Sequence, residues 1–204
     1  MVDAVTAAER AALATGALAD LRDPAPLLER ETVFEGAVWN VVRDRVAFGD
    51  GELVREYVQH TGAVAILAID DEDRVLLINQ YRQPIGARDW EIPAGLLDIP
   101  GEEPLAAAQR ELAEEADLEA DTWSDPIVFH TTPGGSDEVL HVYEARGLRA
   151  TAAFDRTDEE AEIVTRWAPL DEVVDAVLGG RVHNGILMVA VLAAAARRSG
   201  RARA

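Results

Sequence analysis

The spacing of hydrophobic positions changes several times along the chain, which predicts a mixture of strands and helices. Segments rich in valine and aromatic residues, either alternating or continuously apolar, are typical of β-strands. They cover residues 31–48, 52–59, 62–69, 75–81, 127–130, 138–145 and 163–167. Gly49-Asp50-Gly51 joins the first two as a predicted hairpin. The acidic run Asp70-Asp71-Glu72-Asp73 could hold a cation, but its position between two strands favours a solvated turn.

Helical spacing predicts one central and two late helices, over residues 105–116, 170–178 and 186–198. Gly179-Gly180 ends the second of these helices, and Asn184 is the expected N-cap of the third. Residues 1–25 are rich in alanine and predict a short helix ahead of the domain. Many strands combined with these helices indicate an α+β fold.

Composition narrows the class of protein. The 204 residues include 38 Asp and Glu against 19 basic residues, all arginine, so the net charge of −19 disfavours nucleic-acid binding. The chain has no cysteine, which excludes disulfides and thiolate zinc sites. No apolar run is long enough to span a membrane, and the first residues lack the basic start of a secretory signal. We therefore expect a soluble cytoplasmic protein that does not bind membranes.

Candidate chemistry concentrates in residues 95–118, GLLDIPGEEPLAAAQRELAEEADL. On the predicted helix, Glu111, Glu114 and Glu115 fall at spacings of three and four residues and crowd one face. An apolar stripe of Leu105, Ala108 and Leu112 is predicted to face the core. The three carboxylates suit a hard cation such as Mg²⁺. By spacing alone, a solvated acidic helix face is the favoured interpretation and a cation site the alternative.

The whole string resembles the Nudix box, the loop–helix–loop signature of hydrolases that act on nucleoside diphosphates linked to another moiety. The positions that match are Gly95, Glu102, Arg110, Glu111, Leu112, Glu114, Glu115 and Leu118. Two positions depart from the pattern: the loop before Glu102 is one residue longer, and Asp117 replaces a terminal glycine. Aspartate is among the few residues tolerated in the left-handed conformation that ends a helix.

The resemblance implies a Nudix fold, a mixed β-sheet between helices (α/β/α), preceded by an N-terminal antiparallel sheet. It also implies that Glu111, Glu114, Glu115 and the carbonyl oxygen of Ala94 bind Mg²⁺ or Mn²⁺. Arg110 and Glu102 would then orient the helix carboxylates.

Outside the box, the chain is similar to the ADP-ribose pyrophosphatase subfamily over roughly residues 30–195. The string QYRQPIGARDWEIPAG and Pro133, placed some sixteen positions past the box, carry this likeness. It implies that Arg82 contacts the diphosphate, and that Glu91, Ser136 and Glu138 line the ribose end. Arg82 and Glu91 could instead form a structural ion pair, and Ser136 could merely serve its turn.

The subfamily uses a glutamate on a late mobile loop to activate water. In the aligned segment DEEAEI, Glu159 is the expected base, and Glu160 or Glu162 would complete the metal site. The alignment there can slip by one or two positions. The four histidines show no paired metal spacing and are interpreted as structural.

The resemblance further implies a homodimer in which the early hairpin crosses to the partner. The expected organisation is an extension over 1–25, a dimer-forming β region over 26–60, a Nudix hydrolase domain over 61–198 and a basic tail over 199–204. The expected reaction is hydrolysis of ADP-ribose, a small-molecule substrate, to AMP and ribose 5-phosphate. The alternatives are another Nudix substrate, such as a different nucleotide-sugar or a damaged nucleoside triphosphate, and a non-catalytic ADP-ribose sensor.

Overall fold

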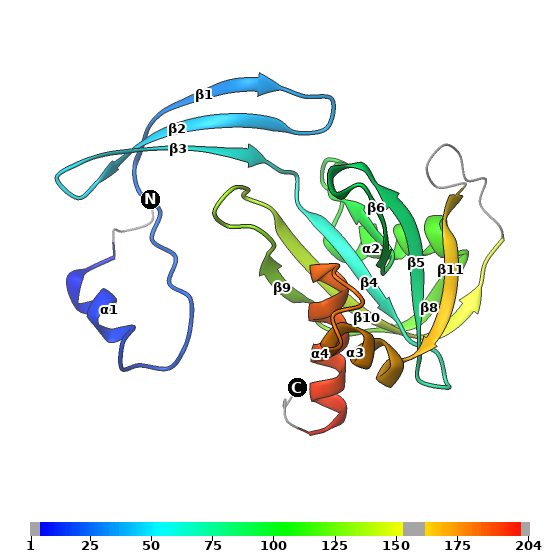
Figure 1. Cartoon of the computed structure of the whole chain (residues 1–204). Helices are drawn as coiled ribbons and strands as arrows, with labels where there is room; N and C mark the ends of the chain where they lie inside the picture. Colours follow the sequence, from blue (N-terminus) through cyan, green and yellow to red (C-terminus); the bar gives the residue numbers. More distant parts are fainter. Residues whose placement is uncertain (1–4, 153–161, 201–204) are drawn as a thin grey trace. The chain divides into compact units, whose positions relative to one another are not determined.

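The computed structural model describes residues 5–152 and 162–200. The chain divides into two compact units. The first comprises Met1–His60 with Gly134–Ser136, and the second Thr61–Pro133 with Asp137–Ala204. Figure 1 labels most of the elements of both units, and each unit is described by itself.

The first unit contains a short helix α1 (Ala7–Ala12) and a three-stranded antiparallel sheet of β1 (Leu27–Glu35), β2 (Asn40–Phe48) and β3 (Gly51–Gln59). The turn between β2 and β3 is confirmed, with Gly49 at φ 59°. The prediction of a single strand over residues 31–48 is wrong, because the chain reverses at Gly36. A Cβ there would lie 2.3 Å from the carbonyl oxygen of Trp39, so only glycine fits this turn.

Arginine–carboxylate pairs connect the strands of this sheet. Arg30 on β1 donates two hydrogen bonds to Asp44 on β2, at 2.7 and 2.6 Å, and the hydroxyl of Tyr57 on β3 donates to the same carboxylate at 2.8 Å. The hydrogen bonds from Arg30 lower the pKa of Asp44, which is buried. β1, by contrast, is exposed along its whole length.

The second unit contains two sheets. The first is a five-stranded mixed sheet of β7 (Ala94–Leu96), β4 (Ala63–Ala68), β10 (Val139–Ala150) and β8 (Leu118–Trp123), with β9 (Ile127–His130) paired to β10. Within it β4 and β10 run parallel and the remaining pairs antiparallel. The second is an antiparallel sheet of β11 (Val164–Pro169), β5 (Arg74–Arg82) and β6 (Ala87–Glu91). A 3₁₀ turn, η1 (Gln83–Ile85), connects β5 to β6.

Three helices cover the two faces of β4. Its side chains alternate between two buried clusters: Ala65 and Leu67 pack with α3 (Leu170–Leu178) and α4 (Gly185–Arg198), while Val64 and Ile66 pack with α2 (Pro104–Ala116). Burial on both faces explains why β4 is continuously apolar. The predicted arrangement of a mixed sheet between helices is thus confirmed (Figure 1).

Of the predictions made for individual helices, the N-cap of α4 is confirmed and the apolar stripe of α2 is only partly confirmed. Asn184 caps α4 as expected, since its side chain accepts a hydrogen bond from Leu187 N at 3.0 Å. On α2, Ala108 and Leu112 are buried, but Leu105 is 37% exposed, so the predicted stripe is wrong at that position. Among the helices of the described residues, none is long and apolar enough to cross a bilayer.

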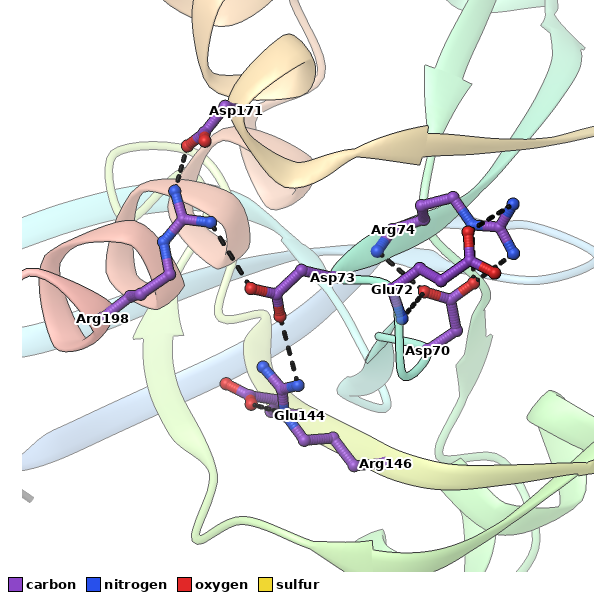
Figure 2. Close-up of polar contacts among 8 residues, drawn as sticks. All are labelled: Asp70, Glu72, Asp73, Arg74, Glu144, Arg146, Asp171 and Arg198. Carbon is purple, nitrogen blue, oxygen red and sulfur yellow. Dashed lines mark hydrogen bonds and ion pairs between the residues drawn. The ribbon is translucent and has the colours of Figure 1, made fainter.

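Arginines hold the acidic turn between β4 and β5 (Figure 2). Asp70 accepts hydrogen bonds from the backbone and side chain of Arg74, at 2.8 and 2.7 Å. Asp73, in the left-handed conformation at φ 58°, contacts Arg146 at 3.4 Å and Arg198 at 3.6 Å. The sequence predicted a solvated turn, and the structure adds that three of its carboxylates, those of Asp70, Glu72 and Asp73, pair with arginines of this chain, including those on β10 and α4.

Candidate active site

The glutamates of interest lie on α2, whose two ends are locally determined. Pro104 occupies the first turn, where its missing N–H costs nothing. Asp117 ends the helix in the left-handed conformation, φ 53° and ψ 38°, and its N–H donates to the carbonyl oxygen of Ala113 at 3.0 Å. Aspartate therefore takes the helix-terminating position that the sequence comparison assigned to it.

Two glutamates of α2 meet the β7 segment. Glu115 is 8% exposed, and its Oε2 accepts a hydrogen bond from the backbone N–H of Ala94 at 2.9 Å. The carboxyl group of Glu111 lies against the bare Cα of Gly95, where a Cβ would come within 2.0 Å of the Glu111 Cδ. Gly95 is thus needed because the carboxylate takes up the space of a side chain.

Arg110 binds three carboxylates at once. Its Nε and Nη2 donate to Glu102 at 3.1 and 3.0 Å, and its Nη1 donates to Glu111 at 2.6 Å and to Glu114 at 3.1 Å. Hydrogen bonding to Glu102 is the main reason that the pKa of Arg110 is raised, and the same bonds lower the pKa of Glu102. One guanidinium therefore sets the orientation of the loop glutamate and of two helix glutamates.

Burial opposes ionisation of Glu111. Desolvation raises the pKa of Glu111, and Arg110 only partly offsets it, while the charges of Glu114 and Asp98 act in the same direction as burial. Removing a charged carboxylate from water is costly unless a cation compensates for it. Excess negative charge of this kind is what a divalent ion would neutralise.

The residues present fit a hard divalent cation by their chemistry. Glu111, Glu114 and Glu115 supply carboxylate oxygens, and Ala94 supplies a carbonyl, the oxygen ligands that Mg²⁺ and Mn²⁺ favour. Within residues 5–152 and 162–200, no three acidic or histidine side chains already converge as a ready-made metal cage. Instead, Arg110 and the Ala94 N–H engage these carboxylates.

A second charged group lies on β5 and β6. The Arg82 Nε and Nη2 donate to the two carboxylate oxygens of Glu91, both at 2.7 Å, and the Gln80 side chain donates to Glu91 at 3.3 Å. Glu91 is 5% exposed. By strand alternation Gln80 and Arg82 share a face with Leu76, which belongs to the α2 cluster. This group therefore lies on the α2 side of its sheet.

The remaining predicted residues are dispersed. Ser136 belongs to the first unit, where it bridges to Val58. Glu138 belongs to the second unit and accepts a hydrogen bond from the Thr131 hydroxyl. Glu138 lines a cavity of about 500 Å³ together with Thr131, Thr132, Asn184 and apolar residues of β9 and α4, whereas Ser136 is not among its lining residues. Glu162 forms an ion pair with Arg88, whereas Glu159 and Glu160 lie outside the described residues.

Sequence reasoning missed three polar residues of this region. Gln80 stands within the QYRQ string, yet nothing in the sequence showed that it bonds to Glu91. Asp98, which acts on the pKa of Glu111, lies in the lengthened loop. Arg88 was overlooked because its partner Glu162 lies far along the chain. Cross-strand and loop proximities of this kind carry no local sequence signal.

Comparisons with known proteins agree with this geometry. A NUDIX domain matches residues 59–186. An ADP-ribose pyrophosphatase of Mycobacterium tuberculosis is 43% identical over 85% of this chain and 84% of its own length. A methanol dehydrogenase activator of Bacillus methanolicus is 35% identical over 80% of this chain and 89% of its own length.

A crystal structure of an ADP compounds hydrolase superimposes with a TM-score of 0.69, covering 90% of this chain and all of that one at 21% identity. At that identity the likeness concerns the fold. The matched domain includes the whole of α2 and the β5–β6 group described above. The predicted family and fold are confirmed: the chain belongs to the Nudix family.

Proposed function

We propose that this Nudix protein is a hydrolase that cleaves the diphosphate of ADP-ribose to AMP and ribose 5-phosphate. The observation that carries the proposal is the placement of the half-buried Glu111 against Gly95 and of the buried Glu115 against Ala94. The substrate is taken from the relative that is 43% identical over 85% of the chain and is named an ADP-ribose pyrophosphatase.

The proposed cofactor is Mg²⁺ or Mn²⁺, held by Glu111, Glu114, Glu115 and the carbonyl of Ala94. When bound, such an ion supplies charge neutralisation for the diphosphate and acidifies a coordinated water. Glu102 and Arg110 hold the carboxylates in place for this task through the bonds described above. Glu160 and Glu162 are proposed as further ligands from the loop.

Arg82 is proposed to bind the diphosphate, and Glu91 to position it. Because Glu91 is buried and takes both Nε and Nη2 of Arg82, it fixes the direction in which the guanidinium points. This assignment favours the positioning role for Glu91 over direct contact with the ribose. We still propose that Glu138 and Ser136 contact the ribose end of the substrate. The position of Glu138 in the lining of the 500 Å³ cavity supports this role for Glu138.

The proposed general base is Glu159. A carboxylate near cations stays ionised, as a base requires, and losing a general base slows a reaction by about 10² to 10⁴. We expect Glu159→Gln to lose at least about a hundredfold in kcat with ADP-ribose binding retained. If Glu162→Gln is the more damaging variant, Glu162 and not Glu159 is the base.

Product analysis tests the reaction. Pure protein is incubated with Mg²⁺ and ADP-ribose, beside ADP-glucose, NADH and a nucleoside triphosphate. AMP and ribose 5-phosphate forming fastest from ADP-ribose supports the proposal. Faster turnover of another compound would show that the protein is a Nudix hydrolase with a different preferred substrate. Binding of ADP-ribose without turnover of any compound would favour a sensor.

We also infer a homodimer built through residues 26–60, which acts in the cytoplasm. β1 supports the dimer, because it is exposed on both faces and carries exposed apolar side chains at Leu27, Leu28 and Phe34. Light scattering of the full chain should give twice the mass of one chain. Phe34→Glu should shift that mass towards the monomer, whereas a dimeric Phe34→Glu variant would place the interface elsewhere.

A further inference from the structure

A hollow of about 190 Å³ lies between α3 and the sheet of β11, β5 and β6, away from the residues discussed above. Its floor consists of core side chains, each at most 8% exposed. They are Leu77, Ala168, Val173 and Val182. Trp90 and Ala176 form its apolar walls. The hollow is open to solvent at its mouth and reaches down to the hydrophobic core.

Its size and lining suit one aromatic ring. Protein cores are close-packed and contain few voids larger than a water molecule. Apolar cavities of about 150 Å³ are known to stay dry and to bind benzene. A ring seated against Trp90 and the aliphatic floor would recover the contacts that the empty space lacks.

Two arginines and one glutamate line the hollow, so its charged lining is net positive in a chain whose net charge is −19. Arg166 is paired with Glu172 at 2.5 Å. Arg181 lies over the end of α3, where a Cβ on Gly179 would come within 2.5 Å of its Nη1. In the part of the chain that the structure describes, Arg181 forms no ion pair. Its guanidinium therefore lies at the hollow, where it can donate hydrogen bonds to an anion.

The hollow is separate from the candidate active site. Trp90 pairs with Asn79 and Glu91 with Ile78, so neighbouring residues of β6 point to opposite faces of the sheet. Glu91 faces the α2 side with Arg82, and Trp90 packs against the cluster that contains α3 and α4. A ligand in the hollow would contact β6 without occupying the diphosphate site.

We propose that this hollow is a second binding site, specific for a small aromatic carboxylate. The ring fills the space between Trp90 and the core floor, and the carboxylate pairs with Arg181. A guanidinium matches the two oxygens of a carboxylate, so a neutral ring of the same size binds more weakly.

Isothermal titration of the full-length protein with benzoate, and with benzyl alcohol as its neutral counterpart, tests the site. Benzoate should bind more tightly than benzyl alcohol. Arg181→Gln should weaken benzoate at least about tenfold, the loss expected for a charged hydrogen bond, and leave benzyl alcohol unchanged. Arg197→Gln removes the same charge from the last turn of α4 and serves as the matched control, with benzoate binding retained.

Ala176→Leu provides an independent variant, because it fills the hollow without changing charge. It should abolish binding of both compounds while ADP-ribose turnover is kept. Equal benzoate affinity in wild type and Arg181→Gln, or undiminished binding in Ala176→Leu, would overturn the proposal. Binding requires neither metal nor turnover, so the result does not depend on the proposed hydrolysis.

Discussion

Two arginine–carboxylate networks in the second unit have similar chemistry but different surroundings. Around α2, Arg110 is shared by Glu102, Glu111 and Glu114. In the network of Figure 2, Arg198 is shared by Asp73 and Asp171. The side chain of Glu111 is 13% exposed, whereas those of Asp73 and Asp171 are 47% and 75% exposed. Water therefore screens the ion pairs of Arg198 more fully than the pair of Arg110 with Glu111.

Burial therefore separates the two roles. In the exposed network each ion pair contributes little, about 0–1 kcal/mol, and connects a turn to neighbouring elements. In the α2 network the pKa of Glu111 is raised by burial despite the presence of Arg110. A carboxylate kept ionised there at a cost in free energy of folding is expected at a functional site rather than at a structural one.

The largest expected effect is on turnover. Glu115→Gln and Glu111→Gln should each lower kcat about a thousandfold, because losing several kcal/mol of charge stabilisation in the transition state has that consequence. Asp73→Asn is the matched variant from the other network and should retain kcat. Steady-state assays with ADP-ribose measure both. Near-wild-type turnover in the two glutamate variants would contradict the metal assignment.

The second largest expected effect is a loss of Mg²⁺ affinity when the arginine that orients the carboxylates is replaced. Arg110→Lys keeps the charge but loses the fork that binds Glu102 and Glu111 together. We expect Mg²⁺ to bind about 10- to 100-fold more weakly, as for other groups that orient metal ligands. Titration calorimetry with Mg²⁺ alone measures this. Arg146→Lys in the exposed network should leave Mg²⁺ affinity unchanged. An equal loss of Mg²⁺ affinity in Arg146→Lys would show that Arg110 has no special part in orienting the metal ligands.

The two networks should also respond with opposite sign in stability without metal. Because the pKa of Glu111 is raised, its charge opposes folding at neutral pH, and Glu111→Gln should raise the free energy of unfolding by up to about 1 kcal/mol. Asp73→Asn should lower it by at most about 1 kcal/mol. Urea denaturation in EDTA at neutral pH gives both values. A clear loss of stability in Glu111→Gln would show that Arg110 fully compensates the carboxylate.

The smallest expected effect is a change with pH in the difference in free energy of unfolding between variant and wild type. Burial acts to raise the pKa of Asp70, but hydrogen bonds from Arg74 and Glu72 outweigh it, so the pKa is lowered. The stability that Asp70 contributes is therefore present at neutral pH and is lost as pH falls below the ordinary aspartate range near 4. Denaturation of Asp70→Asn should differ from wild type at pH 7 and converge with it in acid.

Glu111 should behave in the opposite way. Because its pKa is raised, its cost to the metal-free fold is absent in acid and appears as pH rises through the ordinary glutamate range and above. The advantage of Glu111→Gln should accordingly grow from pH 4 to pH 7. Parallel pH profiles for the two variants would contradict this comparison.

Local signals explain what was predictable from the sequence. The ends of α3 and β9 were predicted correctly because glycine, proline and apolar spacing mark them. β8 was missed because half of its residues, LEADTW, are polar and the strand begins just after the end of α2. The break at Gly36 depends on a contact with Trp39 that spacing does not reveal. The Nudix string placed the glutamates on one helix, whereas the pairing of Arg82 with Glu91 and of Arg88 with Glu162 required tertiary structure.

The central position of β4 has a consequence for biosynthesis. Its parallel partner β10 lies in the second half of the chain, so a ribosome releases the apolar segment Ala63–Ala68 long before residues 140–145 can pair with it. Until then this segment is a short, uncharged stretch of the kind that self-associates. Slower synthesis at lower temperature should therefore increase the soluble yield of the recombinant protein more than any change at its surface.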